Sequence, residues 1–298
     1  EHIELAVVHS GDSACILPSL DISEENVKTI KEYTKKIAEE MHVCGLMNMQ
    51  YAIEDGVVYV LEANPRASRT VPLVSKVCAI SMVPLATEII TSEFTGKESP
   101  IKDQKDREIP YYGVKEAVFP FNMFQEVDPL LGPEMRSTGE VLGVGQNFHE
   151  AMYKGFTAAG TTIPKAGSTI LVTVREMDKE NFLPIAKKFH ELGCKFIATA
   201  GTAKLLEDND IPVQVAKKIS EGVPNILDVI RSGMIDLIID IPKKGNDIHS
   251  DGFKIRRTAI ECDVSIMTSL DTVKALVDVM EHRYTPDTVE VISLSDIK

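Results

Sequence analysis

Cysteine is scarce in this chain, and no two cysteines stand at the spacing of a zinc or redox motif. The 298 residues contain five cysteines and no C-x-x-C pair. They are Cys15, Cys44, Cys78, Cys194 and Cys262. An odd, dispersed set indicates buried free thiols in a reducing compartment, so we expect a cytoplasmic protein.

Long apolar runs, a signal peptide and tandem repeats are also missing. No run of about 18 apolar residues occurs, so we expect no membrane span. The start, Glu1-His2-Ile3-Glu4, has neither a basic beginning nor an apolar stretch behind it, unlike a signal peptide. Patterned sequence begins at once without an initiator methionine, so we expect a fragment or the product of a split gene.

Positive charge is in deficit. Lysine and arginine number 32 against 45 aspartates and glutamates, which gives a formal net charge of -13. This balance argues against nonspecific binding of nucleic acid or anionic membranes, although local basic sites leave anionic substrates open. The hydrophobic share of 44% is ordinary for a globular protein. At about 100–200 residues per domain, the length indicates two domains.

The first part of the chain predicts a helix followed by a β-hairpin. Apolar residues recur at helical spacing over residues 22–42, where Ser23 can cap the start and Gly45 can end the helix. Residues 46–53 and 57–64 are strand-like, with Glu54-Asp55-Gly56 between them. We expect a three-residue loop, which pairs Gln50 with Val60 and puts Gln50, Glu62 and Asn64 on one face. A two-residue loop would put Gln50 on the opposite face.

The densest polar cluster lies on the second predicted strand and its exit. It comprises Gln50, Glu62, Asn64, Arg66 and Arg69. Carboxylate and amide oxygens on one face suit a magnesium ion that shares its shell with phosphates. Arginines just beyond suit phosphoryl oxygens, and the chemistry would be phosphoryl transfer. The alternative is an edge strand with solvated charges.

A second polar element is the run His9-Ser10-Gly11-Asp12-Ser13. Gly11 permits a tight turn, and backbone amides, His9 and Ser10 can lie against a phosphate. The alternative is a plain turn. His2, Glu4 and His9 do not predict zinc, because no further histidine or cysteine stands at ligand spacing.

The later part of the chain alternates strands with helices. Residues 93–110 read as a polar loop, residues 111–165 as a mixed region, and residues 158–167 as a turn-rich linker. Strands are predicted at 169–174, 194–198, 237–241 and 264–267, and helices at 178–192, 225–232 and 270–280. This alternation predicts a parallel sheet covered on both faces.

Residues 199–202 can bind a phosphate. Thr199-Ala200-Gly201-Thr202 follows an apolar strand and opens a helix, so hydroxyls, amides and a helix N-terminus meet there. Lys179 follows the first strand and can reach the same end of the sheet, where open parallel sheets bind ligands. Lys217 and Lys218 add positive charge. The alternative is a capped helix start with solvated lysines.

In combination these segments resemble the large subunit of carbamoyl phosphate synthetase. The resemblance runs in order through essentially the whole chain and is carried by Glu1–Glu4, Val8–Cys15, Gly45–Gln50, Glu62–Pro72, Lys115–Asn122 and Asp128–Glu140. It implies an α/β chain in two parts. Residues 1–162 would be the C-terminal portion of the second ATP-grasp domain, which is α+β. Residues 163–298 would be a doubly wound parallel domain like methylglyoxal synthase.

The resemblance implies roles for residues in the first part. Gln50 and Glu62 match ligands of ATP and of Mg²⁺ or Mn²⁺, Asn64 matches a metal ligand, and Arg66 and Arg69 match arginines near the transferred phosphoryl group. Val7, Val8, His9 and Ser10 match a segment that lines ATP, with Val7 in place of a glycine. His2 lies in a region that resembles a potassium site, so K⁺ is a further candidate cofactor.

Glu4, Asp12 and Glu116 match acids that hold ornithine, an amine effector, in some members.

The resemblance also implies control by a phosphorylated effector. Lys179, Thr199, Thr202 and Lys218 match its contacts, and the candidates are a pyrimidine nucleotide, a purine nucleotide or phosphoribosyl pyrophosphate. One departure concerns Asp240-Ile241-Pro242, where the family pattern has Asn-Thr-Thr, so donors are lost and a carboxylate is gained. The implied partners are a glutaminase small subunit and the remainder of the large subunit, with a homo-oligomer as an option.

Three functions follow from this sequence. The first is part of a ligase that phosphorylates carbamate with ATP for pyrimidine and arginine biosynthesis, although the front of the ATP-grasp unit is missing and the isolated chain should be inactive. The second is a stand-alone effector-binding module with a remnant of the catalytic domain. The third is a lyase that forms methylglyoxal, with Asp236 or Asp240 as base. The regulatory members of the family are not known for that reaction.

Overall fold

The computed structural model describes residues 1–298 except residues 99, 102–108, 125, 243–249 and 295–298. The chain forms two compact units. The first holds Glu1, Ile16–Gly113 and the chain from Glu290 on, and the second holds His2–Cys15 and Val114–Val289. The domain boundary between residues 162 and 163 stays a prediction, because these units are defined by contacts and divide the chain elsewhere.

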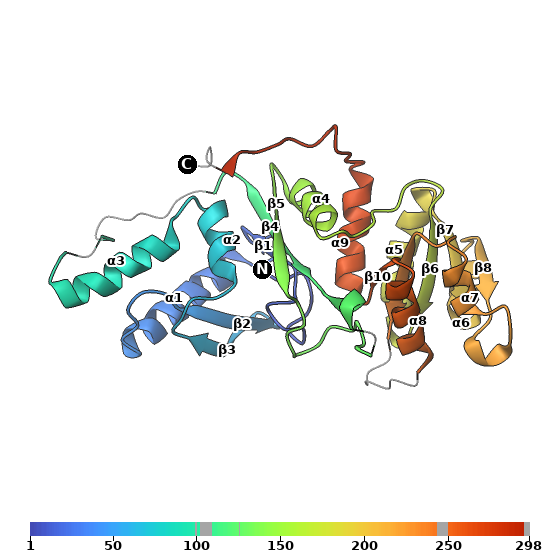
Figure 1. Cartoon of the computed structure of the whole chain (residues 1–298), viewed down its shortest axis with the longest axis horizontal. Coiled ribbons are helices and arrows are strands. Elements are labelled where there is room, and N and C mark those ends of the chain that lie inside the picture. Colours follow the sequence, from blue (N-terminus) through green and yellow to red (C-terminus); the bar gives the residue numbers. More distant parts are fainter. Residues whose placement is uncertain (99, 102–108, 125, 243–249, 295–298) are drawn as a thin grey trace. The chain divides into compact units, whose positions relative to one another are not determined.

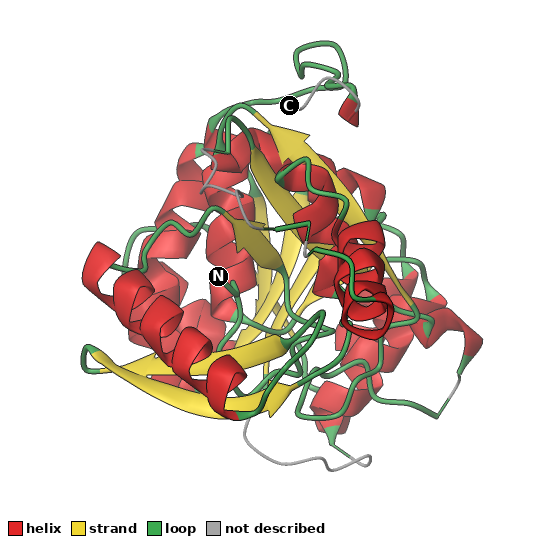
Figure 2. Cartoon of the chain, turned by 90° about the vertical axis from the view of Figure 1, so that its left-hand side faces the viewer, coloured by secondary structure: helices red, strands yellow, loops and turns green. Residues whose placement is uncertain are grey.

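In the first unit, helix α1 (Glu24–Glu40) packs on the hairpin of β2 (Asn48–Glu54) and β3 (Val57–Asn64), as Figures 1 and 2 show. The predicted cap is confirmed, because the Ser23 side chain accepts the N–H of Asn26 at 3.2 Å. Both elements were predicted from periodicity, with boundaries within two residues.

The hairpin turn has two residues, so the predicted three-residue loop is wrong. Glu54 pairs with Val57, and only Asp55 and Gly56 lie between the strands. Their φ angles are 51° and 77°. Positive φ at both central residues is the conformation of a two-residue type I′ turn, whose twist matches that of the strands.

A β-bulge nevertheless brings Gln50 to the predicted face. Tyr51 pairs with Val60, but the register then shifts, and Gln50 pairs with Glu62. Leu61 is therefore the extra residue of a bulge in β3. Residues that stand directly opposite each other in an antiparallel pair lie on the same face, so Gln50 and Glu62 share one.

Two helices that were not predicted follow the hairpin. They are α2 (Thr70–Val77) and α3 (Met82–Thr95), so residues 93–95 of the predicted loop are helical. Residues 99 and 102–108 of that loop lie outside the described residues. In the described part of the chain, no single helix is long and apolar enough to cross a membrane. The bent pair α2 with Met82–Ser92 passes that test by length and composition only.

A small sheet has the strand order β1–β4–β5, with β1 at Cys15–Leu17, β4 at Tyr112–Val118 and β5 at Gly139–Gly145. Helix α4 (Phe148–Ala158) packs directly on β5. A Cβ atom at Gly143 would lie 2.0 Å from the carbonyl oxygen of Ala151. This close approach explains why a residue without a side chain stands at that point of β5.

The second unit contains a five-stranded parallel sheet in the order β10–β9–β6–β7–β8. The strands are β6 (Thr169–Val174), β7 (Lys195–Thr199), β8 (Val213–Ala216), β9 (Leu237–Ile241) and β10 (Ser265–Met267). The predicted parallel sheet is confirmed. The chain runs from β6 to one side and later returns to its other side at β9, so the switch point lies between these strands.

Helices cover both faces of this sheet (Figure 1). They are α5 (Lys179–Glu191), α6 (Ala200–Glu207), α7 (Ile226–Arg231), α8 (Asp251–Glu261) and α9 (Leu270–Glu281). Ile230 of α7 and Ile255 of α8 join Leu171 and Ile238 in one buried cluster. On the other side, α5 contacts α6 and α9. The doubly wound arrangement is therefore confirmed.

The prediction that the thiols are buried is only partly correct. Cys15 and Cys194 are buried, Cys78 and Cys262 are partly exposed, and Cys44 is exposed. All five are free. Burial raises the pKa of Cys194 to about 11, so this thiol stays protonated and unreactive near neutral pH.

Candidate functional sites

The hairpin presents three oxygen-bearing side chains together. Gln50 stands opposite Glu62, and the Asn64 amide donates to the Glu62 carboxylate at 2.9 Å. Tyr51, the next residue after Gln50, bonds through its hydroxyl to Thr34 of α1 at 2.6 Å. Because side chains alternate along a strand, Gln50 and Glu62 lie on the face turned away from α1. The predicted cluster of Gln50, Glu62 and Asn64 is thus brought together.

This donor set fits a hard cation. Among the described residues no group of three histidines, cysteines, aspartates or glutamates could hold a metal ion. A metal at the hairpin would therefore have one carboxylate, from Glu62, and amide oxygens from Gln50 and Asn64. Mg²⁺ and Mn²⁺ accept oxygen ligands, and Mg²⁺ sites commonly complete their shell with phosphates and water. Since Asn64 uses its amide N–H toward Glu62, its oxygen is left for a ligand.

The two predicted arginines lie at the exit of β3. Arg66 is exposed and donates to the carbonyl of Ala67 at 2.9 Å, and Arg69 directly precedes α2. Asn48 fixes this exit, because its amide donates to the hydroxyl of Ser68 at 3.2 Å. Asn48 was not predicted as a site residue. Its place at the start of β2, opposite the end of β3, is what gives it this role.

The His9–Ser13 turn, in the second unit, is braced from inside the protein. The ammonium of Lys115, whose residue is 2% exposed, donates to the carbonyls of Ser10 and Gly11 at 3.2 and 3.1 Å. The N–H of Gly11 donates to His9 Nδ1, and the N–H of His9 donates to the carbonyl of Gly132. Most amides of the turn therefore have internal partners, and a phosphate there would depend on the His9 and Ser10 side chains. Lys115 was not singled out from the sequence.

Val7, Val8 and His2 flank this turn. Val7 is 71% exposed, while the N–H of Val8 donates to the carbonyl of Leu5 at 3.0 Å. Burial, with the positive charges of the amino terminus and Lys115, lowers the pKa of His2 to about 4. The imidazole is therefore neutral near pH 7 and does not repel a nearby monovalent cation.

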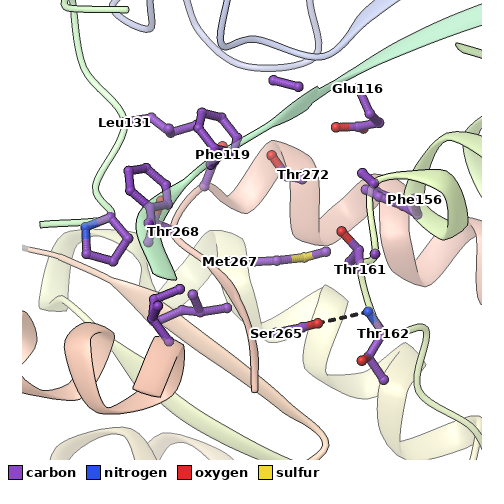
Figure 3. Close-up of a pocket in the computed structure, with 18 of the residues that line it drawn as sticks. Glu116, Phe119, Leu131, Phe156, Thr161, Thr162, Ser265, Met267, Thr268 and Thr272 are labelled. Carbon is purple, nitrogen blue, oxygen red and sulfur yellow. Dashed lines mark hydrogen bonds between the residues drawn. The ribbon is translucent and has the colours of Figure 1, made fainter. Parts of the chain in front are cut away.

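The three acids predicted to hold an amine line one cavity of about 460 Å³. Figure 3 shows Glu116 among the residues of this cavity. Glu4 already accepts bonds from Ser13, Ala14 and Thr272, and Asp12 accepts the N–H groups of Arg136 and Ser137. Hydroxyls of Thr161, Ser265, Thr268 and Thr272 line the cavity, and none of its described lining residues is Lys, Arg or His.

Among these three acids, Glu116 is the one with unused bonding capacity. Its buried Oε1 atom has no hydrogen-bond partner. Burial and the neighbouring charge of Glu4, only partly offset by Lys115, raise the pKa of Glu116 to about 8. Near pH 7 this carboxyl is mostly protonated, and a cation in the cavity would favour its ionised form.

The predicted effector residues gather at the carboxyl ends of β6, β7 and β8. The Lys179 ammonium lies 3.7 Å from where a Cβ of Gly201 would be, at the start of α6. The Thr202 hydroxyl accepts the N–H of Val174 at 3.2 Å and keeps its own proton to donate. Thr199 ends β7 opposite Ala216 of β8, and Lys218 follows two residues later.

Lys179 is paired with Glu176 at 2.6 Å, but the Glu176 side chain is 88% exposed. Exposed pairs of this kind contribute only about 0–1 kcal/mol, so an anion can displace Glu176. The capped-helix alternative from the sequence is not supported at Thr199, because its side chain makes no capping bond to α6.

The departure at residues 240–242 has a structural counterpart. Arg256 of α8 donates from Nε and Nη2 to Asp128, at 2.6 Å each, and from Nη1 to Asp240 at 2.7 Å. The three side chains are buried. Burial raises the pKa of Asp240 to about 6, an effect that Arg256 counteracts and the charge of Asp128 reinforces. At this position the chain therefore has an internal ion pair in place of the donors implied by the family pattern.

Two known families match separate parts of the chain. Residues 2–93 match the family described as carbamoyl-phosphate synthase L chain, ATP binding domain, and residues 181–268 match the MGS-like domain family. The chain is thus of the class that joins the C-terminal part of an ATP-grasp domain to a methylglyoxal-synthase-like domain.

Similar curated proteins cover nearly the whole chain. A carbamoyl phosphate synthase large chain from Clostridium botulinum (strain Loch Maree / Type A3) is 45% identical over 297 residues, which are 99% of this chain and 28% of that protein. A carbamoyl phosphate synthase large chain, C-terminal section, from Methanocaldococcus jannaschii is 44% identical over 307 residues, covering 100% of this chain and 49% of that protein. The large chain from Archaeoglobus fulgidus is 47% identical over 282 residues, with coverage of 94% and 26%.

The chain belongs to the carbamoyl phosphate synthase large-chain family and corresponds to its C-terminal part. It spans about a quarter to a half of the length of these relatives.

Proposed function

We propose that this chain supplies part of the site that phosphorylates carbamate with ATP, giving carbamoyl phosphate and ADP, within a longer large subunit. The observation that carries the proposal is the bulge of β3, which sets Gln50 opposite Glu62 while Asn64 bonds to Glu62. A bound Mg²⁺ or Mn²⁺ would neutralise phosphate charge during the transfer.

In this proposal each group of the hairpin has a distinct task. Glu62 and Gln50 bind ATP and the metal, and Asn64 adds an amide oxygen. Arg66 and Arg69, at the exit of β3, contribute positive charge to the transferred phosphoryl group. Val7, Val8, His9 and Ser10 line the nucleotide, with the turn held by Lys115.

The partners in this proposal are the remainder of the large subunit and a glutaminase small subunit, with self-association as an option. The protein would be cytoplasmic and would serve pyrimidine and arginine biosynthesis, with K⁺ near His2 as a further cofactor. No role in binding nucleic acid or membranes is proposed. A second candidate, a stand-alone effector-binding module, is favoured by the cluster of Lys179, Gly201 and Thr202 within one compact unit.

Effector binding is tested by calorimetric titration of this chain with uridine monophosphate, inosine monophosphate and phosphoribosyl pyrophosphate. We expect saturable binding of one of them, and Lys179→Ala should weaken it about tenfold or more, because a charge-assisted phosphate contact is lost. Lys204→Ala is the control, since Lys204 is an exposed lysine of α6 that pairs with Asp208. Equal affinity in Lys179→Ala and the unmodified chain would remove Lys179 from the site.

We further propose that the cavity at Glu116 takes an amine effector such as ornithine. Because a cation requires Glu116 to be ionised, affinity should rise with pH from 6 to about 8 and then level off. Calorimetry at pH 7 in buffers of different ionisation enthalpy should detect release of up to about one proton per ligand bound. Glu116→Gln should abolish this release. Proton uptake, or binding with the same proton release in Glu116→Gln, would contradict the proposal.

A further inference from the structure

Residues Asp128–Ser137 form an irregular stretch that bonds to helix α8, which packs on the parallel sheet, and to the His9–Ser13 turn. We name this stretch the bracing segment. At its first residue, Asp128 accepts two bonds from Arg256 of α8, each 2.6 Å long. The neighbouring Arg257 donates to the carbonyls of Phe121 and Val127 at 3.1 and 3.2 Å. Two consecutive arginines of α8 therefore hold the chain that enters the bracing segment.

The other end of the bracing segment is bonded to the turn. The N–H groups of Arg136 and Ser137 donate to the Asp12 carboxylate at 2.7 and 2.9 Å. In its middle, the carbonyl of Gly132 accepts the N–H of His9 at 2.8 Å. The side chain of Arg136 also returns to the carbonyl of Asp128 at 2.6 Å, which closes the segment on itself.

Arg256 connects this segment to the sheet. Its third donor, Nη1, bonds to Asp240 in β9, beside the switch point between β6 and β9. The Arg256 and Asp240 side chains are 3% and 4% exposed, so the pair is shielded from solvent and ions. Arg256 holds Asp128 through two bonds and Asp240 through one, and all three side chains are buried. A displacement of Asp240 would therefore move Arg256, and with it Asp128, and would not be absorbed by solvent.

We infer that Arg256 is a positioning residue: it sets the conformation of the His9–Ser13 turn through the bracing segment. That conformation depends on the position of Asp240, at the carboxyl end of β9, which we call the sheet edge. The positions joined in this way are far apart in the sequence, and all of them belong to the second unit. The role of an effector at that edge rests on the proposed function, but the connection from Arg256 to the turn does not.

Hydrogen exchange measured by mass spectrometry on the full chain tests the connection. Arg256→Lys keeps the charge but loses the bidentate geometry, and Asp128→Asn keeps the size but loses the charge. Both should speed exchange in peptides covering His9–Ser13 and residues 136–137 about tenfold, with β7 and β8 unchanged. Lys188→Gln is the matched control, because Lys188 of α5 also bonds to two carboxylates, Asp278 and Glu281, both on α9 of this unit.

The outcomes separate the inference from the proposed function. Unchanged exchange at His9–Ser13 in two folded variants, or the same rise in Lys188→Gln, would overturn the inference. As a second arm, uridine or inosine monophosphate bound to the unmodified chain should alter exchange at His9–Ser13, and Asp128→Asn should bind it but lose that response. A bound nucleotide with no effect at the turn of the unmodified chain would overturn the role of the sheet edge. Absence of any binding would count against the proposed effector site alone.

Discussion

Replacement of Glu62 by alanine in the longer protein is expected to lower ATP formation from carbamoyl phosphate and ADP by about a thousandfold or more. Glu62 is the one carboxylate of the proposed ligand set, and Asn64 is oriented by its bond to it. Without Glu62 the site would have only amide oxygens, which hold a divalent cation weakly. Loss of the charge stabilisation supplied by such an ion corresponds to several kcal/mol in the barrier.

The reverse reaction is the sharper assay, because it isolates carbamate chemistry from glutamine hydrolysis. Glu54→Ala serves as the control, since Glu54 lies on the same hairpin but at its tip, next to the turn. We expect Glu54→Ala to retain near-normal turnover. ATP synthesis at the unmodified rate by Glu62→Ala would refute the assignment of this hairpin as the phosphoryl-transfer site.

Asp240→Asn is expected to stabilise the protein by about 2–3 kcal/mol at pH 7, although it removes a charge that is paired with Arg256. Two carboxylates share one buried guanidinium, so one negative charge is not compensated. Burial, in spite of Arg256, therefore raises the pKa of Asp240 to about 6 from an ordinary value of 3.8. Asparagine keeps an oxygen that can accept the bond from Arg256, and it is the residue that the family pattern implies there.

The sign of the pH dependence follows from the raised pKa. The folded state holds the Asp240 proton up to about pH 6 and the unfolded state only up to about 3.8, so this group's contribution to stability falls as pH rises from 4 to 6. Asp240→Asn has no ionisable group at this position, so its stability does not show this fall. Its stability advantage should therefore be near zero at pH 4 and reach its full size above pH 6.

Urea denaturation followed by circular dichroism at pH 4, 6 and 8 measures this difference. Asp208→Asn is the matched control, because it makes the same change in net charge at a side chain that is 58% exposed. We expect less than about 0.5 kcal/mol from it at any of these pH values. A destabilised Asp240→Asn variant at pH 8 would mean that Arg256 depends on both carboxylates, contrary to this account.

The sequence alone determined the elements whose signal is local. Strand β6 and the helices α5, α7 and α9 follow from apolar runs and 3.6-residue periodicity, whereas helix α8 was not predicted. The Ser23 cap follows from a hydroxyl before an amphipathic run. The residues Glu62 and Asn64 were found in the same way, because two positions in one strand share a face. The family resemblance added roles to residues that local patterns left ambiguous.

Only the tertiary structure decided which distant residues meet. The turn is one residue shorter than predicted, and the bulge at Leu61 returns Gln50 to the face of Glu62. This bulge arises from pairing between strands, so it leaves no mark in the pattern of a single strand. Asp128 and Arg256 stand 128 residues apart, and Glu4 and Thr272 stand 268 residues apart. Such contacts depend on how helices and loops close over the sheet, so their energies come from burial, which no local pattern of charges encodes.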